Sequence, residues 1–261
     1  VLDDAQRFDE AIEAYNRSLA ISPKDADTHY NIGIAYKHAG RPEKAIESWQ
    51  KAAELNPDSP QAPMALADYY YENGHFDMAM EEYQRILRRW PAIQEGHFNL
   101  AAIYFKKNMV DYAREEYQRV IEINDRNDYA RKAYINLGII ASKNGKPGDE
   151  TSDKALGYIQ KALLLKPGDA EALYSLGTVY ARQEMCEKAI DTFMQALRAA
   201  KDSKLNAECY NNIGKCYYKQ GHYKKALQSF TRGIEEDPTS AEIRMNRKTA
   251  MQAYEDELAR K

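Results

Sequence analysis

The stretch Ala26-Asp-Thr-His-Tyr-Asn-Ile-Gly-Ile-Ala-Tyr36, followed by Ala45, Trp49 and Pro57, decides the fold of this chain. The same residue types recur at the same offsets about every 34 residues along nearly the whole sequence. Such a unit is a helix-turn-helix that cannot bury its apolar face alone, so successive copies must stack.

Two positions in the repeat are small, when Ala26 is numbered as position one. The eighth position is occupied by Gly33, Ala67, Ala101, Gly138, Gly177 and Gly214. The twentieth is occupied by Ala11, Ala45, Ala79, Ala113, Ala155, Ala189 and Ala226. Small residues let the two helices of a unit approach closely. The eleventh position is usually Tyr, which fills the space between units, and a proline usually ends the second helix.

These residues resemble the tetratricopeptide repeat, whose signature combines a Leu-Gly pair, Tyr, Ala, Phe and Pro in a unit of 34 residues. The seventh and eighth positions supply the Leu-Gly pair at Leu137-Gly138 and Leu176-Gly177. The resemblance implies an all-α fold, a right-handed superhelical solenoid of antiparallel helix pairs. It also implies a scaffold that binds other proteins.

The repeat predicts one continuous domain over residues 1–261. Its parts are a half unit 1–25, full units 26–59, 60–93, 94–127, 131–169, 170–203 and 207–240, and a C-terminal capping helix 241–261. In the half unit, Val1-Leu2 is interpreted as the end of a first helix and residues 8–21 as the second helix. In the cap, one apolar stripe is expected to pack on the last unit: Ile243, Met251, Tyr254 and Leu258.

Three insertions break the regular spacing. Extra residues at 128–130 and 204–206 follow units that lack their proline, so the neighbouring helices are predicted to be longer there. The segment 145–154 is rich in Gly, Pro and polar residues and is predicted to be an exposed, mobile loop. Tolerated drift is the favoured explanation of the insertions. The alternative is that they change the curvature or contact a partner.

The composition excludes several classes of protein. The chain has 261 residues, a formal net charge of −3 and 30% charged residues, which argues against nucleic-acid binding. It has no apolar run long enough for a membrane span, so no membrane insertion is predicted. The three cysteines, Cys186, Cys209 and Cys216, have no CxxC spacing and favour a reducing compartment.

Compartment and self-association follow as expectations from the same features. The protein is predicted to be cytoplasmic, or periplasmic or exported if an N-terminal signal has been removed. The half unit leaves an apolar end without a cap, which missing residues, a partner or a second copy of the chain would cover. Self-association through this N-terminal end is therefore one predicted interaction.

Signatures of catalysis and metal binding are absent from the sequence, so no cofactor is predicted and the chain is predicted not to be an enzyme. There is no Walker loop, no GxSxG and no HExxH. The five histidines are dispersed along the chain: His29, His38, His75, His97 and His222.

Ligands of the tetratricopeptide family usually lie along the concave face formed by the first helices. The sixth position on that face carries Asn31, Asn99, Asn136 and Asn212, interrupted by Ala65 and Ser175. A carboxamide has one donor group and one acceptor, which match a peptide bond. The row is similar to the asparagine ladder of the glycosyltransferase that adds N-acetylglucosamine to Ser and Thr. Alternatively, the asparagines keep the groove soluble and bond within or between helices.

Apolar side chains on the same face suggest where selectivity would come from. The candidates, from the fifth, ninth and twelfth positions, are Tyr30, Ile34, Phe98, Phe105, Ile135, Ile139 and Tyr174. The alternative is that neighbouring helices bury them. Acidic second positions and basic thirteenth positions complement the helix dipole, although a basic rim could also steer an acidic peptide. The carboxylate clamp of chaperone-binding members is rejected, since no unit has Lys at the fifth position or Asn at the ninth.

The sequence therefore predicts a scaffold that binds an extended peptide or a helix of another protein in its groove. One alternative is a substrate-recruiting or regulatory arm of an enzyme whose catalytic domain lies outside this chain. Another is a self-associating adaptor of a cell-envelope or transport complex.

Overall fold

A computed structural model describes residues 2–144 and 150–260 of the chain, and these residues form fourteen α-helices and no strand. The predicted all-α class is confirmed. The chain divides into two compact units, Val1–Arg119 and Val120–Lys261, within which most of the contacts between Cα atoms are made. Each is described below by itself, and the single continuous domain expected from the repeat remains a prediction.

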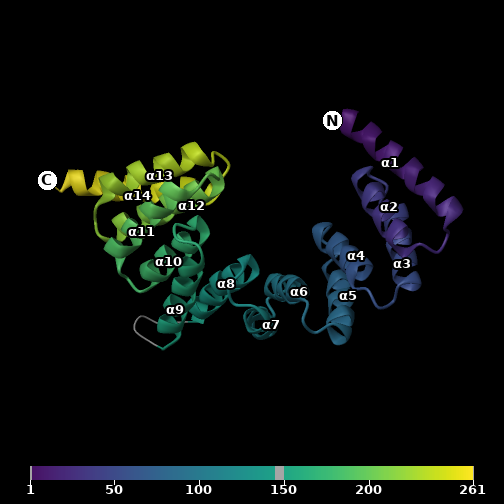
Figure 1. Ribbon diagram of the computed structural model, residues 1–261. Helices are drawn as coiled ribbons and strands as arrows, with labels where there is room; N and C mark the ends of the chain where they lie inside the picture. The colour runs from purple at the N-terminus through teal and green to yellow at the C-terminus, as the bar shows by residue number, and fades with distance from the viewer. Residues whose placement is uncertain (1, 145–149, 261) are drawn as a thin grey trace. The chain divides into compact units, whose positions relative to one another are not determined.

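Unit 1 consists of helix pairs that follow the repeat. Its helices are α1 (Leu2–Ile21), α2 (Ala26–His38), α3 (Pro42–Leu55), α4 (Gln61–Glu72), α5 (Phe76–Arg89), α6 (Gln94–Lys106) and most of α7 (Val110–Ile123). Helix α2 packs on α3 and α4 packs on α5, each pair being joined by a short turn (Figure 1).

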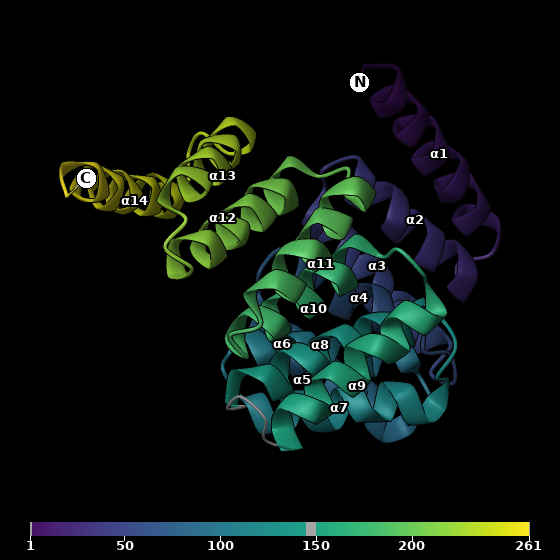
Figure 2. The same ribbon diagram turned by 90° about the vertical axis from the view of Figure 1, so that its left-hand side faces the viewer.

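Unit 2 repeats this arrangement. It contains the end of α7 and then α8 (Asp128–Asn144), α9 (Glu150–Leu165), α10 (Ala170–Arg182), α11 (Cys186–Ala199), α12 (Ser203–Lys219), α13 (Tyr223–Glu236) and α14 (Ala241–Ala259). Figures 1 and 2 both show α12 alongside α13, and α14 packs on this pair.

The small eighth position works as the sequence predicts, because a bulky side chain of the second helix occupies the space beside it. A Cβ atom added to Gly33 would lie 2.5 Å from Nε1 of Trp49, which is 1% exposed. A Cβ atom added to Gly214 would lie 2.5 Å from Cε1 of Phe230. The pairs are thus held together by an aromatic ring pressed against a helix backbone.

The turn between the two helices of a unit requires a left-handed backbone conformation at the fifteenth position. This position has φ between 59° and 77° at Gly40, Gly74, Asn108, Glu184 and Gly221. The corresponding residue of the half unit is Gln6, which lies within the continuous helix α1. The interpretation of Val1-Leu2 as the end of a first helix is therefore wrong for Leu2, which begins α1. Val1 lies outside the described residues.

The longer helices predicted beside the two short insertions are confirmed. Helices α8 and α12 each have 17 residues, whereas α2, α6 and α10 have 13. Three added residues, with no proline before them, extend each first helix by nearly one turn.

The predicted loop at 145–154 needs a correction for its second half. Residues 145–149 lie outside the described residues, but α9 already begins at Glu150. Glu150 and Asp153 place negative charge in the first turn, where the helix dipole favours it, and Lys154 pairs with Glu150 at 2.6 Å. Ser152 is buried, so this turn packs against the rest of unit 2.

The C-terminal capping helix is present, but its packing face differs from the predicted stripe. Ile243 and Ala250 are buried, whereas Met251 and Leu258 are 37% and 53% exposed. The helix occupies the place of a first helix in the repeat, and Ile243 and Ala250 stand at the positions that face the preceding unit. Met251 and Leu258 point away from that interface.

Candidate functional site

The candidate site is the surface formed by the second, fifth, sixth, ninth and twelfth positions of the first helices, called the first-helix face below. Each of these positions is three or four residues from another of the set, so they fall on one side of a helix. Successive first helices pack side by side within each compact unit, for example α4 with α6 and α10 with α12. The face is therefore assembled from several repeats.

In unit 1, Asn99 joins two repeats through a polar network. Its Nδ2 atom donates to Oδ1 of Asp68 on α4 and to Oη of Tyr83 on α5, both at 3.1 Å. The Tyr83 hydroxyl in turn donates to Asp68. Burial raises the pKa of Asp68, and the nearby Glu95 carboxylate adds to this, while the bonds from Tyr83 and Asn99 oppose it.

In unit 2, the same link recurs at two successive junctions. Asn212 donates through Nδ2 to the Tyr174 hydroxyl of the preceding repeat at 3.3 Å. Asn246 donates to Oδ1 of Asn211 at 2.9 Å, and Asn211 donates to Glu242 at 3.1 Å. Burial raises the pKa of Tyr174 to about 12, so its hydroxyl stays protonated at neutral pH. A sixth-position asparagine thus anchors its amide nitrogen on the repeat before it.

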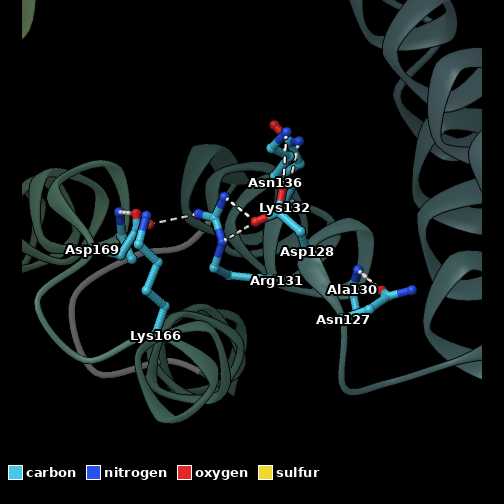
Figure 3. Close-up of polar contacts among 9 residues, drawn as sticks. Asn127, Asp128, Ala130, Arg131, Lys132, Asn136, Lys166 and Asp169 are labelled. Atoms are coloured by element: carbon cyan, nitrogen blue, oxygen red, sulfur yellow. Dashed lines mark hydrogen bonds and ion pairs between the residues drawn. The ribbon is translucent and has the colours of Figure 1, made fainter.

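Asn136 is anchored differently, since Nδ2 donates to the backbone oxygen of Lys132 on its own helix at 3.1 Å (Figure 3). The same view shows Arg131 reaching Asp169, with Nη1 and Oδ2 2.7 Å apart. Both side chains are almost fully buried, at 7% and 4% exposure. Asp169 also caps α10 by accepting from the Ala172 nitrogen, so the pair ties α8 to the start of the next first helix.

Asn31 is the exposed member of the row. Over the part of the chain that the structure describes, its side chain has no hydrogen-bond partner. The four predicted asparagines therefore comprise two that link repeats, one that bonds within its helix and one that is free. The alternative interpretation, bonding within or between helices, describes the amide nitrogens of Asn99, Asn136 and Asn212.

Most of the apolar candidates are half-buried. This group contains Tyr30, Ile34, Phe98, Phe105, Ile139 and Tyr174. Phe98 packs edge-on against Tyr117, with ring centres 5.6 Å apart, and Tyr174 packs against Phe193 at 5.8 Å. Each ring therefore combines a packed side with a side that remains accessible.

Ile135 was expected to be exposed on this face, and this expectation is wrong. It is 5% exposed and belongs to a core cluster with Ala172 and Val179 of α10. Helix α10 packs on α8 and covers the side chain. Ile135 contributes to the junction between repeats and is not available to a ligand in this structure.

Three residues of the face were missed in the sequence. Asn246 occupies the sixth position if the count continues past the last full unit, and that count would have found it. Asp68 and Asn211 lie at the ninth and fifth positions, where apolar residues were singled out. Their role depends on hydrogen bonds to the following repeat, which periodicity does not indicate.

Two other kinds of site were also sought. No group of three or more His, Cys, Asp or Glu side chains that could hold a metal ion occurs among the described residues. Within the same residues, no helix is both long and apolar enough to cross a membrane.

Comparison with known families gives four matches along the chain. Models described as tetratricopeptide repeat match residues 26–59, 64–129 and 169–235, and a model described as TPR repeat matches residues 4–40. Together they match residues in both compact units and span most of the chain.

A curated relative is the human protein O-mannosyl-transferase TMTC1, which is 29% identical over 119 residues. The match spans 44% of this chain and 13% of that protein. The matched segment is thus a small part of this relative.

Solved structures of similar fold include the Cut9-Hcn1 hetero-tetramer of the APC/C, with a TM-score of 0.68 and 19% identity over 95% of this chain and 47% of that one. PilF of Pseudomonas aeruginosa has a TM-score of 0.66 and 17% identity over 91% and 97% of the two chains. YrrB, described as a TPR protein with an unusual peptide-binding site, has a TM-score of 0.58 and 21% identity over 78% and 99%. At these identities the likeness concerns the fold.

Proposed function

Because the chain belongs to the tetratricopeptide repeat family, we propose that its first-helix face binds an extended peptide or a helix of another protein. The fold itself is that of a scaffold for protein-protein interaction. The proposal adds where the ligand binds and which side chains contact it.

The observation that carries the proposal is the orientation of the asparagine side chains. Asn99, Asn212 and Asn246 each use Nδ2 to bond the preceding repeat. In the described part of the chain, none of their Oδ1 atoms has a donor. A carboxamide held by its nitrogen presents its oxygen in a fixed direction, where it can accept an N–H from a bound backbone.

Fixed acceptors favour binding because little side-chain freedom is lost when the ligand arrives. The half-buried ring of Phe98 lies beside Asn99 on α6, and the half-buried ring of Tyr174 lies on α10, where its hydroxyl accepts from Asn212 of α12. Both rings supply apolar contacts near these acceptors. The peptide-binding site ascribed to YrrB adds support from a protein of similar fold.

The test uses peptides selected from a random display library against the whole chain. Affinity would then be compared between the wild type and an Asn31→Ala/Asn136→Ala variant, which removes one face amide from each unit. Neither asparagine bonds another repeat, so folding should be preserved. The matched control is Asn16→Ala/Gln195→Ala, which alters exposed residues on the second helices α1 and α11.

The proposal expects the face variant to weaken binding about tenfold, a loss of roughly 1.4 kcal/mol, and the control to leave it unchanged. Equal affinity for all three proteins would count against the face as the binding site. Circular dichroism would check that helicity is the same in each.

A second candidate is that the chain forms the recruiting arm of a larger enzyme. The similarity to a stretch of a human transferase favours it, since that stretch is a small part of a protein named for a catalytic activity. Sequencing the coding region on both sides of this segment tests it. A catalytic domain encoded in the same reading frame would support this candidate. In-frame stop codons on both sides, with no such domain between them, would reject it.

A further inference from the structure

Unit 2 has a groove of about 680 Å³ lined by residues of α11, α12 and α13. Met194 comes from α11, Tyr210 and Tyr217 come from α12, and Lys224, Lys225 and Arg232 come from α13. None of the lining residues stands at a second, fifth, sixth, ninth or twelfth position of a first helix. The groove is therefore distinct from the first-helix face.

Part of the groove lining is apolar. Met194 is 44% exposed, and the rings of Tyr210 and Tyr217 are half-buried. A methionine thioether adapts to side chains of different shape, and a volume of this size accommodates several of them. The lining alone does not identify the ligand.

The charged side chains of the lining indicate the charge of the ligand. Three cations, Lys224, Lys225 and Arg232, and one anion, Glu235, line the groove, which gives a local charge of 3 − 1 = +2 on a chain of net charge −3. Among the described residues, no carboxylate lies within 4.0 Å of any of the three cationic groups.

Two of these cations lie over the aromatic lining. Nζ of Lys225 is 5.5 Å from the Tyr217 ring centre, and Cζ of Arg232 is 5.9 Å from the Tyr210 ring centre. Each charge is thus held beside the apolar surface, where a ligand that contacts the ring also meets the cation.

We propose that this groove binds an acidic segment of a partner protein that carries an apolar side chain among its Asp and Glu residues. The apolar side chain would pack on Met194, Tyr210 and Tyr217. The carboxylates would pair with Lys224, Lys225 and Arg232. The site would let the scaffold hold a second partner while the first-helix face is occupied.

The test is fluorescence anisotropy with a short fluorescein-labelled peptide in which Asp and Glu flank a central Leu-Leu pair. The expected result is saturable binding that weakens as salt is added, because screened charges attract less. Replacing Leu-Leu by Ala-Ala should weaken it too. A single-stranded oligonucleotide of equal charge is the comparison ligand and should bind more weakly.

Charge-reversal variants locate the site. Lys225→Glu/Arg232→Glu should weaken binding about tenfold or more, since two attractive charges become repulsive. The matched control is Lys161→Glu/Lys188→Glu, which also reverses two exposed lysines that lie over tyrosine rings, those of Tyr134 and Tyr180, outside the groove. It should change affinity by less than about twofold.

Three results would overturn the proposal. They are an absence of saturable binding, an equal loss in both double variants, and an oligonucleotide that binds as tightly as the peptide. An equal loss would mean that only overall charge matters, and tight oligonucleotide binding would make the groove a nucleic-acid site.

Discussion

At the residue scale, the repeat depends on a few close contacts that the sequence predicts well. A small eighth position was expected wherever two helices cross, and Gly33, Gly177 and Gly214 each face a buried aromatic ring of the partner helix. The burial of Ile135 was not predictable in this way. Helical periodicity assigns a residue to a side of its own helix, but the covering helix α10 is a matter of tertiary packing.

Gly214→Ala should destabilise unit 2 by about 1–3 kcal/mol, because the new Cβ atom would lie 2.5 Å from the buried ring of Phe230. The matched control is Gly157→Ala in α9, where no atom lies within 4 Å of the added Cβ. That change should stabilise the protein by about 0.5–1 kcal/mol, since alanine favours a helix. Urea unfolding measures both, and equal effects of the two substitutions would refute the close-contact explanation.

His97 should make stability depend on pH. It is 8% exposed, its Nδ1 lies 2.5 Å from the Glu116 carboxylate and its Nε2 lies 3.0 Å from the Pro91 oxygen. Burial lowers the pKa of His97, but the hydrogen bonds to Glu116 and Pro91 outweigh it and raise this pKa above its ordinary value of 6.5. The folded state therefore favours the protonated ring.

The stabilisation from His97 is fully present below pH 6.5 and is lost as the pH rises through the higher pKa of the folded state. Melting temperatures measured across this range should fall with rising pH in the wild type. The fall should be smaller in His97→Gln, while the exposed His75→Gln should behave like the wild type. An unchanged slope in His97→Gln would exclude this histidine as the cause.

At the element scale, lengths and junctions account for most of the differences from the regular repeat. The extra turn of α8 and α12 follows from missing prolines and added residues, so the sequence indicated it. The start of α9 at Glu150 did not follow from composition, because the polar residues at 150–154 suit both a loop and the first turn of a helix. Burial of Ser152 favours the helix, and burial is a property of the folded chain.

The junction between α8 and α10 should depend on Arg131. Its substitution by Met leaves Asp169, whose side chain is 4% exposed, without its buried cationic partner. Among the described residues, Asp169 then keeps an ion pair with the more exposed Lys166 at 3.1 Å and its hydrogen bond from the Ala172 nitrogen. Breaking a buried pair in this way should cost about 3–5 kcal/mol. Urea unfolding of Arg131→Met should therefore show a large fall in midpoint.

The control for this junction is Arg126→Met. The Arg126 side chain is 87% exposed and pairs with Asp125 at 3.6 Å, so its loss should change stability by less than about 0.5 kcal/mol. If the Arg131 variant were as stable as this control, the buried pair would not be what ties α8 to α10.

At the scale of the whole molecule, the family and the helix pairs could be predicted from one sequence. The same residue types recur at the packing positions of every repeat, so each repeat gives independent support for the same helix pair. The binding face could be predicted only as a set of positions. Which amide groups are already bonded, and which remain open to a ligand, depends on contacts between repeats such as Asn246 with Asn211. This contact joins side chains 35 residues apart, and the periodicity of the sequence does not indicate it.

The central claim is that partners bind on the first-helix face, and photocross-linking of a selected peptide tests it most directly. The peptide would carry a benzophenone side chain, and mass spectrometry would map the residues to which it becomes attached. The account predicts attachment on first helices, at residues beside Asn31, Asn99, Asn136 or Asn212. Attachment confined to the second helices, such as α3, α5, α9 or α11, would contradict it.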